Sequence, residues 1–200
     1  METLLSLVVG IGLSAACGFR VFVPLLVVSL ATHSGHLSLA PGFEWLASDA
    51  ALIALAVATA AEIAGYYVPW VDHALDALAT PAAVVAGTVV TASLVTDVSP
   101  FLRWTLAAIA GGGSAGLVQG ATVVARGLST ATTGGLANPL FATVELGGSV
   151  ATSLMALVAP VVALVLVVGL AGVGGVAWAR RGSGRGAQAS PSAGAGPTSD

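Results

Sequence analysis

The chain has 200 residues, of which 56% are hydrophobic and 8% are charged, with a formal net charge of -3 and a mean hydropathy of +0.99. Soluble domains carry about 25% charged residues, so the composition excludes an ordinary soluble domain and predicts an integral membrane protein in contact with the lipid bilayer. No basic patch suited to nucleic acid is present, and a single cysteine excludes an intramolecular disulfide.

Apolar runs separated by polar or Pro/Gly-rich breaks indicate the membrane-spanning elements. A helix needs about 20 residues to cross the hydrocarbon core, and these runs are too long for the strands of a β-barrel. We therefore expect an all-α, polytopic transmembrane bundle with about six spans, within residues 1–181. In chain order the predicted spans are 4–31, 50–68, 81–97, 102–126, 137–158 and 160–179.

The first predicted span contains an arginine inside an apolar run, in the stretch SAACGFRVFVPLLVV (residues 14–28). Arg20 would cost about 2.5 to 3.5 kcal/mol in hydrocarbon, and Pro24 cannot donate a hydrogen bond to its carbonyl. We therefore expect the first helix to bend or break here. Three roles for Arg20 stay open: an ion pair with a buried glutamate, contact with a substrate, or extension of the side chain to the membrane interface.

The later connections carry signals for where helices begin. Residues 68–81 predict a short amphipathic helix on the membrane surface. The Thr-Pro pair at 80–81 would then begin the third span, and the Asn-Pro pair at 138–139 the fifth. Pro160 either kinks one long helix or separates the fifth span from the sixth.

The carboxy-terminal residues 182–200 are small and polar and predict a disordered cytoplasmic tail. Arginines near the span ends indicate orientation, because cytoplasmic loops are enriched in Lys and Arg. With an even number of spans, Arg126 and the arginines at 180, 181 and 185 fall in the cytoplasm and only Arg103 outside. We therefore predict a multi-pass membrane protein with both termini in the cytoplasm.

Two short similarities raise the alternative of an internal repeat. The stretch GLSAA (residues 12–16) is similar to GGSAG (112–116), and EIAG (62–65) is similar to ELGG (145–148). Two three-span halves would be inverted relative to each other, as in many secondary transporters. The two offsets differ, so chance similarity in a chain rich in Gly and Ala is the other explanation.

Small residues recur at intervals of four on two predicted spans. They are Gly10, Ser14 and Gly18 on the first span, and Gly112, Gly116 and Gly120 on the fourth. Such stripes let helices approach closely in lipid. We expect these two spans to pack together; the alternative is that the spacing only reflects the abundance of Gly, with 26 in 200 residues. A homo-oligomer formed through the Gly/Ser stripes is a further expectation.

Polar residues on other predicted spans are candidate partners for Arg20. Glu62 and Glu145 each lie about 10 Å from the predicted cytoplasmic end of a span, and Gln119 reaches a similar depth. We predict that Arg20, Glu62, Gln119 and Glu145 form a polar, substrate-binding site. One arginine against two glutamates leaves one acid spare, which suggests proton coupling; alternatively, that acid is permanently protonated or hydrogen-bonded.

The sequence carries no familiar catalytic or metal-binding motif. A Walker loop, an H-E-x-x-H motif and a G-x-S-x-G elbow are all absent. We therefore predict no enzyme, no catalytic residue, no cofactor and no metal site.

Three long stretches carry a resemblance to a known family: GLSAACGFRVFVPLL, AEIAGYYVPWVDHALDALATPAAVVAGTVV and GGGSAGLVQGATVVARGLSTATTGGLANPLFATVELGG. On these, the chain resembles a bacterial family of integral membrane proteins, domain of unknown function four-one-two-six. The family has no established activity, so the resemblance implies a shared membrane fold and a bacterial inner membrane as its location, and it transfers no catalytic role. It draws attention to Gly18, Phe19, Arg20, Pro24, Glu62, Tyr66, Tyr67, Pro69, Trp70, Asp72, Gln119, Asn138, Pro139 and Glu145.

Two functions follow as hypotheses. The first is a transporter or channel for a small solute or a proton, with the polar site between the two halves of the chain. The second is a non-enzymatic scaffold or accessory subunit, in which the buried charges only fix the register of the helices. Convergence of Arg20, Glu62 and Glu145 around a cavity would favour the first, and dry packing the second.

Overall fold

The computed structural model describes residues 2–169, without the side chains of residues 2, 69, 70, 72–74, 76 and 77. Within this part of the chain every regular element is a helix, which confirms the all-α prediction. The helices are α1 (Glu2–Cys17), α2 (Phe22–His33), η1 (Glu44–Ala47), α3 (Asp49–Gly65), α4 (Pro69–Leu94), α5 (Pro100–Leu106), the π-helix η2 (Ala107–Gly112), α6 (Gly113–Thr133), α7 (Asn138–Val158) and a last helix, Pro160–Gly169. The predicted disordered tail, 182–200, lies outside the described residues.

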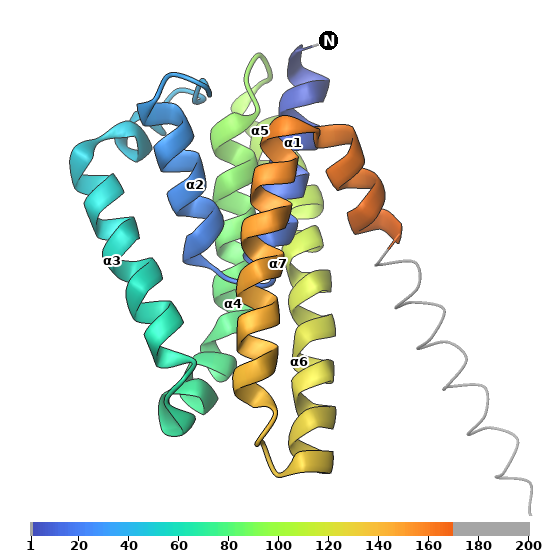
Figure 1. The fold of residues 1–200 in the computed structure, drawn as a ribbon. Coiled ribbons are helices and arrows are strands. Elements are labelled where there is room, and N and C mark those ends of the chain that lie inside the picture. The colour runs from blue at the N-terminus through green and yellow to red at the C-terminus, as the bar shows by residue number, and fades with distance from the viewer. Residues whose placement is uncertain (1, 170–200) are drawn as a thin grey trace, which may run out of the picture.

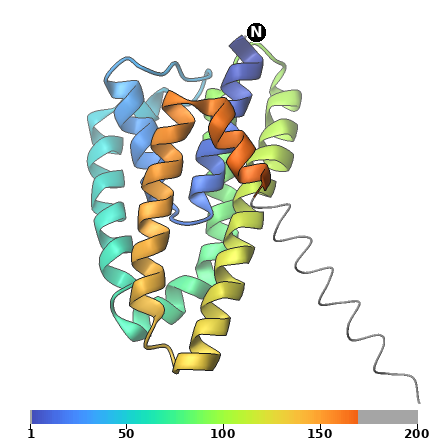
Figure 2. The ribbon, with the colours of Figure 1, turned by 45° about the vertical axis from the view of Figure 1, so that its right-hand side comes forward.

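The first predicted span, 4–31, is wrong, because α1 and α2 form a hairpin that turns back inside the bundle (Figures 1 and 2). With 16 and 12 residues they are about 24 and 18 Å long. The turn at residues 18–21 is closed by hydrogen bonds from the Phe19 and Arg20 N–H groups to the Ala16 carbonyl. Pro24 lies in the first turn of α2, where no N–H is needed, so it begins a new helix instead of kinking the old one.

The hairpin fixes the position of the amino end. Figure 1 shows that end beside the α2–α3 and α4–α5 connections, whereas the α6–α7 connection lies at the opposite end of the bundle. The prediction that the amino terminus lies on the same side as the connection after the fourth span is therefore wrong. The carboxy terminus lies outside the described residues.

Figure 1 shows α3, α4, the continuous α5–η2–α6 stretch and α7 running along the bundle axis over most of its height. By length and apolar composition, two helical stretches could cross a membrane, Pro100–Thr133 and Asn138–Val158. They correspond to the fourth and fifth predicted spans. Six spans are not confirmed, because the other apolar helices in the described part are shorter.

One predicted helix boundary differs in the structure, and another that was left open is decided by it. Residues 69–94 form one helix, α4, with Pro81 inside it, so the pair at 80–81 does not begin a span. A proline inside a helix removes a hydrogen bond and bends the axis, and Figure 2 shows the first turns of α4 running crosswise at the base of the bundle. At the other boundary, Ala159 leaves the helical conformation with φ -140°, and the chain turns back at Pro160. Pro160 therefore separates two helices.

The centre of the bundle is α4, which packs against α1, α2, η2 and α6. Ser14 on α1 donates a hydrogen bond to the Gly87 carbonyl at 2.6 Å, and its Oγ lies 2.8 Å from Thr91 Oγ1. A Cβ on Gly111 of η2 would meet the Gly87 carbonyl at 2.6 Å. Small residues thus bring three helix backbones into contact, as expected in lipid.

The predicted packing of the first span against the fourth is confirmed, because α1 contacts both η2 and α6. The two small-residue stripes, however, do not face each other along their length. Gly18 does face the fourth span, since a Cβ there would lie 2.5 Å from the Ala115 carbonyl oxygen. By contrast, Gly10 meets Thr91 of α4, Gly112 and Gly116 meet Val84 of α4, and nothing lies within 4 Å of Gly120. The small residues of both stripes therefore mainly allow close packing against α4.

The arrangement gives no support to an inverted repeat built on the two sequence similarities. Figures 1 and 2 show α1 and α6 running in the same direction, whereas α3 and α7 run in opposite directions. One two-fold axis cannot relate both pairs of segments. Chance similarity is the simpler explanation.

Gly87→Ala should lower the free energy of unfolding by about 1 to 3 kcal/mol, as overpacking of a filled interior does. The new Cβ would lie 2.7 Å from Ala115 Cβ and 2.9 Å from the Gly111 carbonyl oxygen. Thermal unfolding of the purified protein in detergent measures the change. Gly120→Ala is the matched control, because its Cβ meets nothing within 4 Å. Equal unfolding temperatures for the two variants would contradict this packing.

Candidate functional site

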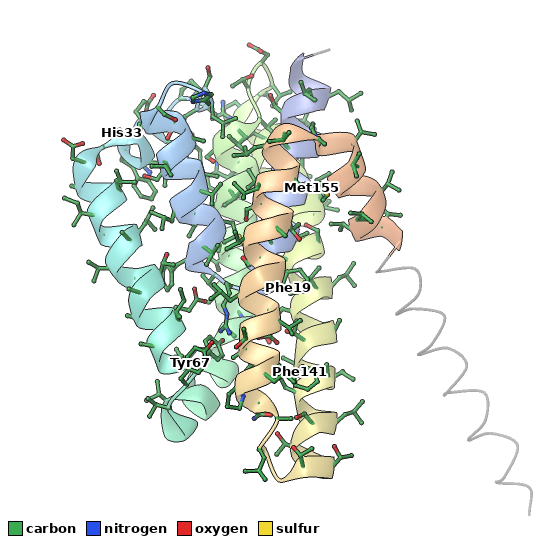
Figure 3. The ribbon with its side chains drawn as sticks, in the orientation of Figure 1. Phe19, His33, Tyr67, Phe141 and Met155 are labelled. Carbon is green, nitrogen blue, oxygen red and sulfur yellow. The ribbon has the colours of Figure 1, made fainter. Side chains whose placement is uncertain are left out.

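Five buried side chains meet where the hairpin turn approaches α3, α6 and α7. We call them the polar cluster: Arg20, Glu62, Tyr66, Arg126 and Glu145, with exposed fractions of 2%, 7%, 7%, 4% and 6%. Figure 3 shows nitrogen and oxygen atoms gathered inside the bundle at this level, between the labelled Phe19 and Tyr67. Charged side chains at such depth are costly unless they are paired, so their contacts determine what the site can do.

Arg20 lies at the hairpin turn and is held on two sides. Its Nη2 donates a hydrogen bond to the Ala142 carbonyl at 2.8 Å and lies 3.6 Å from Glu145 Oε2. The guanidinium carbon lies 3.7 Å from the centre of the Tyr66 ring, a cation–π contact. Nε and Nη1 are buried and have no hydrogen-bond partner. Arg20 is therefore fixed in place with part of its hydrogen-bonding capacity unused.

Glu145 is bound closely by a second arginine. Arg126 Nε lies 2.9 and 3.2 Å from the two carboxylate oxygens of Glu145, and its Nη2 donates to Oε2. The same guanidinium lies 4.6 Å from the centre of the Tyr66 ring. The expected balance of one arginine against two glutamates is therefore wrong, since Arg126 is a buried member of the cluster. The inference of a spare acid loses its basis, and Arg126 no longer counts as a flanking charge for orientation.

Glu62 has a different role from the ion pair expected for it. Its Oε1 and Oε2 accept hydrogen bonds from the backbone N–H groups of Val21 and Phe22, at 2.8 and 3.1 Å. These N–H groups belong to the free amino end of α2, where a carboxylate is favoured. Glu62 therefore joins α3 to the hairpin turn.

The fourth predicted site residue, Gln119, is buried beside the turn with an exposed fraction of 5%. A Cβ on Gly18 would lie 2.9 Å from the Gln119 backbone nitrogen. Within the described part of the chain, no hydrogen bond joins the Gln119 side chain to Arg20, Glu62 or Glu145. The structure thus brings three of the four predicted residues together and leaves the fourth next to them; substrate binding by these residues stays a prediction.

Sequence reasoning missed Arg126 and the role of Tyr66. Arg126 lies seven residues after Gln119, two helical turns along one face, and this spacing could have placed it inside. Tyr66 follows Glu62 by four residues, one turn away. The sequence does not show that Arg126 pairs with Glu145, because Arg126 stands in a polar stretch that is typical of a surface connection.

The buried face of α7 is polar along its length, and the outside of the bundle is apolar. Asn138, Glu145, Ser149 and Ser153 recur at helical spacing and are all buried, and Ser149 donates to the Ala16 carbonyl at 3.1 Å. Large apolar side chains of the long helices are exposed instead: Ile53, Val57, Phe101, Ile109, Leu117, Leu140 and Val144. Exposed apolar side chains along the long helices are compatible with a surface that faces lipid, while the core also contains apolar residues such as Leu13 and Val90.

The side chains of the polar cluster are only 2% to 7% exposed, so solvent hardly reaches them in this conformation. A surface depression lies elsewhere, on α5 and η2, and is lined by Pro100, Phe101, Trp104, Thr105, Ala108 and Ile109. Among the described residues no three His, Cys, Asp or Glu side chains gather in a way that could hold a metal ion.

The connection between α2 and α3 is tied by polar contacts. His33 Nε2 lies 3.7 Å from Asp49 Oδ1. Glu44 accepts a hydrogen bond from the Gly42 N–H at 2.9 Å. Backbone N–H groups of Glu44 itself and of Gly42 hold the pKa of the Glu44 carboxyl below its usual range.

These features define an all-helical protein with a buried polar cluster beside an apolar core and with exposed apolar side chains on its long helices, a pattern compatible with an integral membrane protein. The chain belongs to the family described as Domain of unknown function (DUF4126), whose model matches residues 7–180. The expected family membership is thereby confirmed. Neither the curated proteins nor the solved structures contain a significant match to the chain.

Glu145→Gln should lower the stability by about 3 to 5 kcal/mol, because it removes the charge that faces both guanidinium groups in a buried site. Thermal unfolding in detergent measures the loss. Glu44→Gln is the control, since Glu44 is an exposed carboxylate, and its unfolding temperature should stay close to that of the parent protein. Similar small shifts for both variants would show that the Glu145 contacts contribute little.

Proposed function

We propose that the chain is a multi-pass protein of a bacterial plasma membrane that transports or conducts a small polar solute. The observation that carries the proposal is the hairpin of α1 and α2, which turns inside the bundle and holds a buried arginine there. In membrane proteins, backbone breaks at such depth are tolerated where they are buried in protein or line a water-filled path. Broken helices also form the central substrate sites of many secondary transporters.

The polar face of α7 supports a route for the solute. Ser153, Ser149, Glu145 and Asn138 follow one face of the helix from end to end, all of them buried. Apolar side chains would pack these positions more easily in a purely structural bundle, since unmade buried hydrogen bonds are costly. Ser153 Oγ has no hydrogen-bond partner. Together with the hairpin turn, this face offers polar groups at successive depths.

Each member of the cluster has a proposed role. Arg20 contacts the solute, and Glu145 and Arg126 form the ion pair next to it. Glu62 holds the hairpin turn through the Val21 and Phe22 N–H groups. The nearly complete burial of the cluster then corresponds to a closed state, so access to the site requires the turn or α7 to move.

A scaffold or accessory subunit is the second candidate, and one observation favours it. The side chains of the cluster are almost fully buried, and the Arg126–Glu145 contact is bidentate. Buried ionic groups can serve to fix the register of packed elements. In that case the cluster would stabilise the fold and take no part in permeation.

The hairpin makes a topology prediction that does not depend on the solute. The background is the cysteine-free variant Cys17→Ala. In this background, single cysteines introduced by Thr3→Cys or by Ser34→Cys should react with an impermeant maleimide from the same side of the membrane. Ala131→Cys, near the α6–α7 connection, should react from the other side (Figure 1). Labelling of positions 3 and 34 from opposite sides would contradict the hairpin and show that residues 4–31 form a single span.

Permeation is tested by reconstituting the full chain into liposomes and following their swelling by light scattering. The probes are urea, glycerol and potassium nitrate, the last with valinomycin to balance charge. At least one probe should enter faster than in protein-free liposomes, and Arg20→Gln should return that rate to the protein-free value because it removes the cation at the turn. The control Arg103→Gln should keep the parent rate.

A folded Arg20→Gln protein, judged by size-exclusion profile and helical content, is required for this comparison. Protein-free rates for all three probes would remove the transport proposal and favour the scaffold. A raised rate that Arg20→Gln leaves unchanged would place permeation outside the polar cluster.

A further inference from the structure

We propose that the free guanidinium nitrogens of Arg20 bind a small oxyanion, such as a monocarboxylate or nitrate, at the hairpin turn. The inference rests on the proposed function, since it names the chemical class of the solute. It follows from three features of Arg20: the hydrogen bonds that it lacks, the commitment of the neighbouring carboxylates, and the packing around it.

The hydrogen bonds of Arg20 are incomplete. A guanidinium carries five N–H groups, and here Nη2 makes the only hydrogen bond, to the Ala142 carbonyl. Nε and Nη1 are buried without a partner, and the side chain as a whole is 1% exposed, so bulk water does not reach it. Buried donors are almost always satisfied in proteins. A guest with oxygen acceptors would satisfy these donors.

The nearby carboxylates that the structure describes are engaged elsewhere. Glu62 accepts hydrogen bonds from two backbone N–H groups of the hairpin turn, and Glu145 accepts hydrogen bonds from the Arg126 guanidinium. The distance from Arg20 Nη2 to Glu145 Oε2 is 3.6 Å, longer than the 2.7 to 2.9 Å typical of a charge-assisted hydrogen bond. Arg20 therefore keeps a positive charge that no carboxylate among the described side chains contacts at hydrogen-bonding distance.

The shape of the group selects the class of ligand. A planar guanidinium binds planar oxyanions with two parallel hydrogen bonds, and such contacts are stronger than those to a neutral carbonyl. Tyr66 covers one face of the guanidinium, at 3.7 Å, so the ligand must approach the edge. The tight packing restricts it to a few heavy atoms.

Binding is tested by thermal unfolding of the full chain in detergent, with sodium acetate replacing sodium chloride at constant sodium concentration. A ligand that binds the folded state raises the unfolding temperature in a saturable way. Acetate should do so, whereas acetamide, its neutral analogue of similar shape, should not. Sodium nitrate should produce a shift of the same kind.

Arg20→Gln should raise the acetate concentration needed for half of the maximal shift in unfolding temperature by at least about tenfold. The control Arg103→Gln should leave that concentration unchanged. If Arg20→Gln does not fold, Arg20→Lys takes its place, because it keeps the charge but loses the planar fork, and the same weakening is expected. An acetate effect that equals that of acetamide, or that survives in the Arg20 variant, overturns the inference.

The two proposals fail in different ways. Saturable acetate binding that depends on Arg20, without permeation of any probe, retains the oxyanion site and removes the transport function. Arg20-dependent permeation of urea or glycerol, without acetate binding, retains transport and removes the oxyanion class.

Discussion

A turn of backbone inside a helix bundle must find partners for its N–H and C=O groups, and the rest of this structure depends on how that requirement is met. The turn between α1 and α2 uses the Ala16 carbonyl for its own N–H groups and the Glu62 carboxylate for the start of α2. Without Glu62, the amino end of α2 would meet no acceptor from α3. The position of one carboxylate thus determines where the chain can reverse.

The remaining contacts of the cluster follow from that reversal. It brings Arg20 to the level of Tyr66 and Glu145, where a straight helix would have carried it past them. Arg126 then supplies the charge that Glu145 needs, and α4 holds the hairpin from the other side through Ser14, Gly87 and Thr91. The close backbone contacts of α4 and the ionic contacts of the cluster therefore support the same short segment.

The sequence predicts the composition of the fold better than its path. An all-helical chain, a break near Arg20 and the convergence of Arg20, Glu62 and Glu145 could be read from residue types and spacing. The reversal could not, because residues 18–21 include two apolar residues and no acidic or amide turn residue, and 4–31 has the length of a span. Arg126 was misplaced because a polar stretch looks the same whether it lies in solvent or against a buried glutamate. The sequence also did not predict that α4 lies at the centre of the bundle, since the contacts of Gly87 and Thr91 depend on tertiary structure.

The hairpin also brings two opposite helix ends together at one depth. The carboxyl end of α1 carries about half a negative charge and the amino end of α2 about half a positive one, from their aligned peptide dipoles. Arg20 follows the first end, and Glu62 contacts the second. The Glu62 carboxylate therefore offsets the partial positive charge at the start of α2, whereas the Arg20 guanidinium extends away to Ala142 and Tyr66, so the two ends of the turn are neutralised unequally.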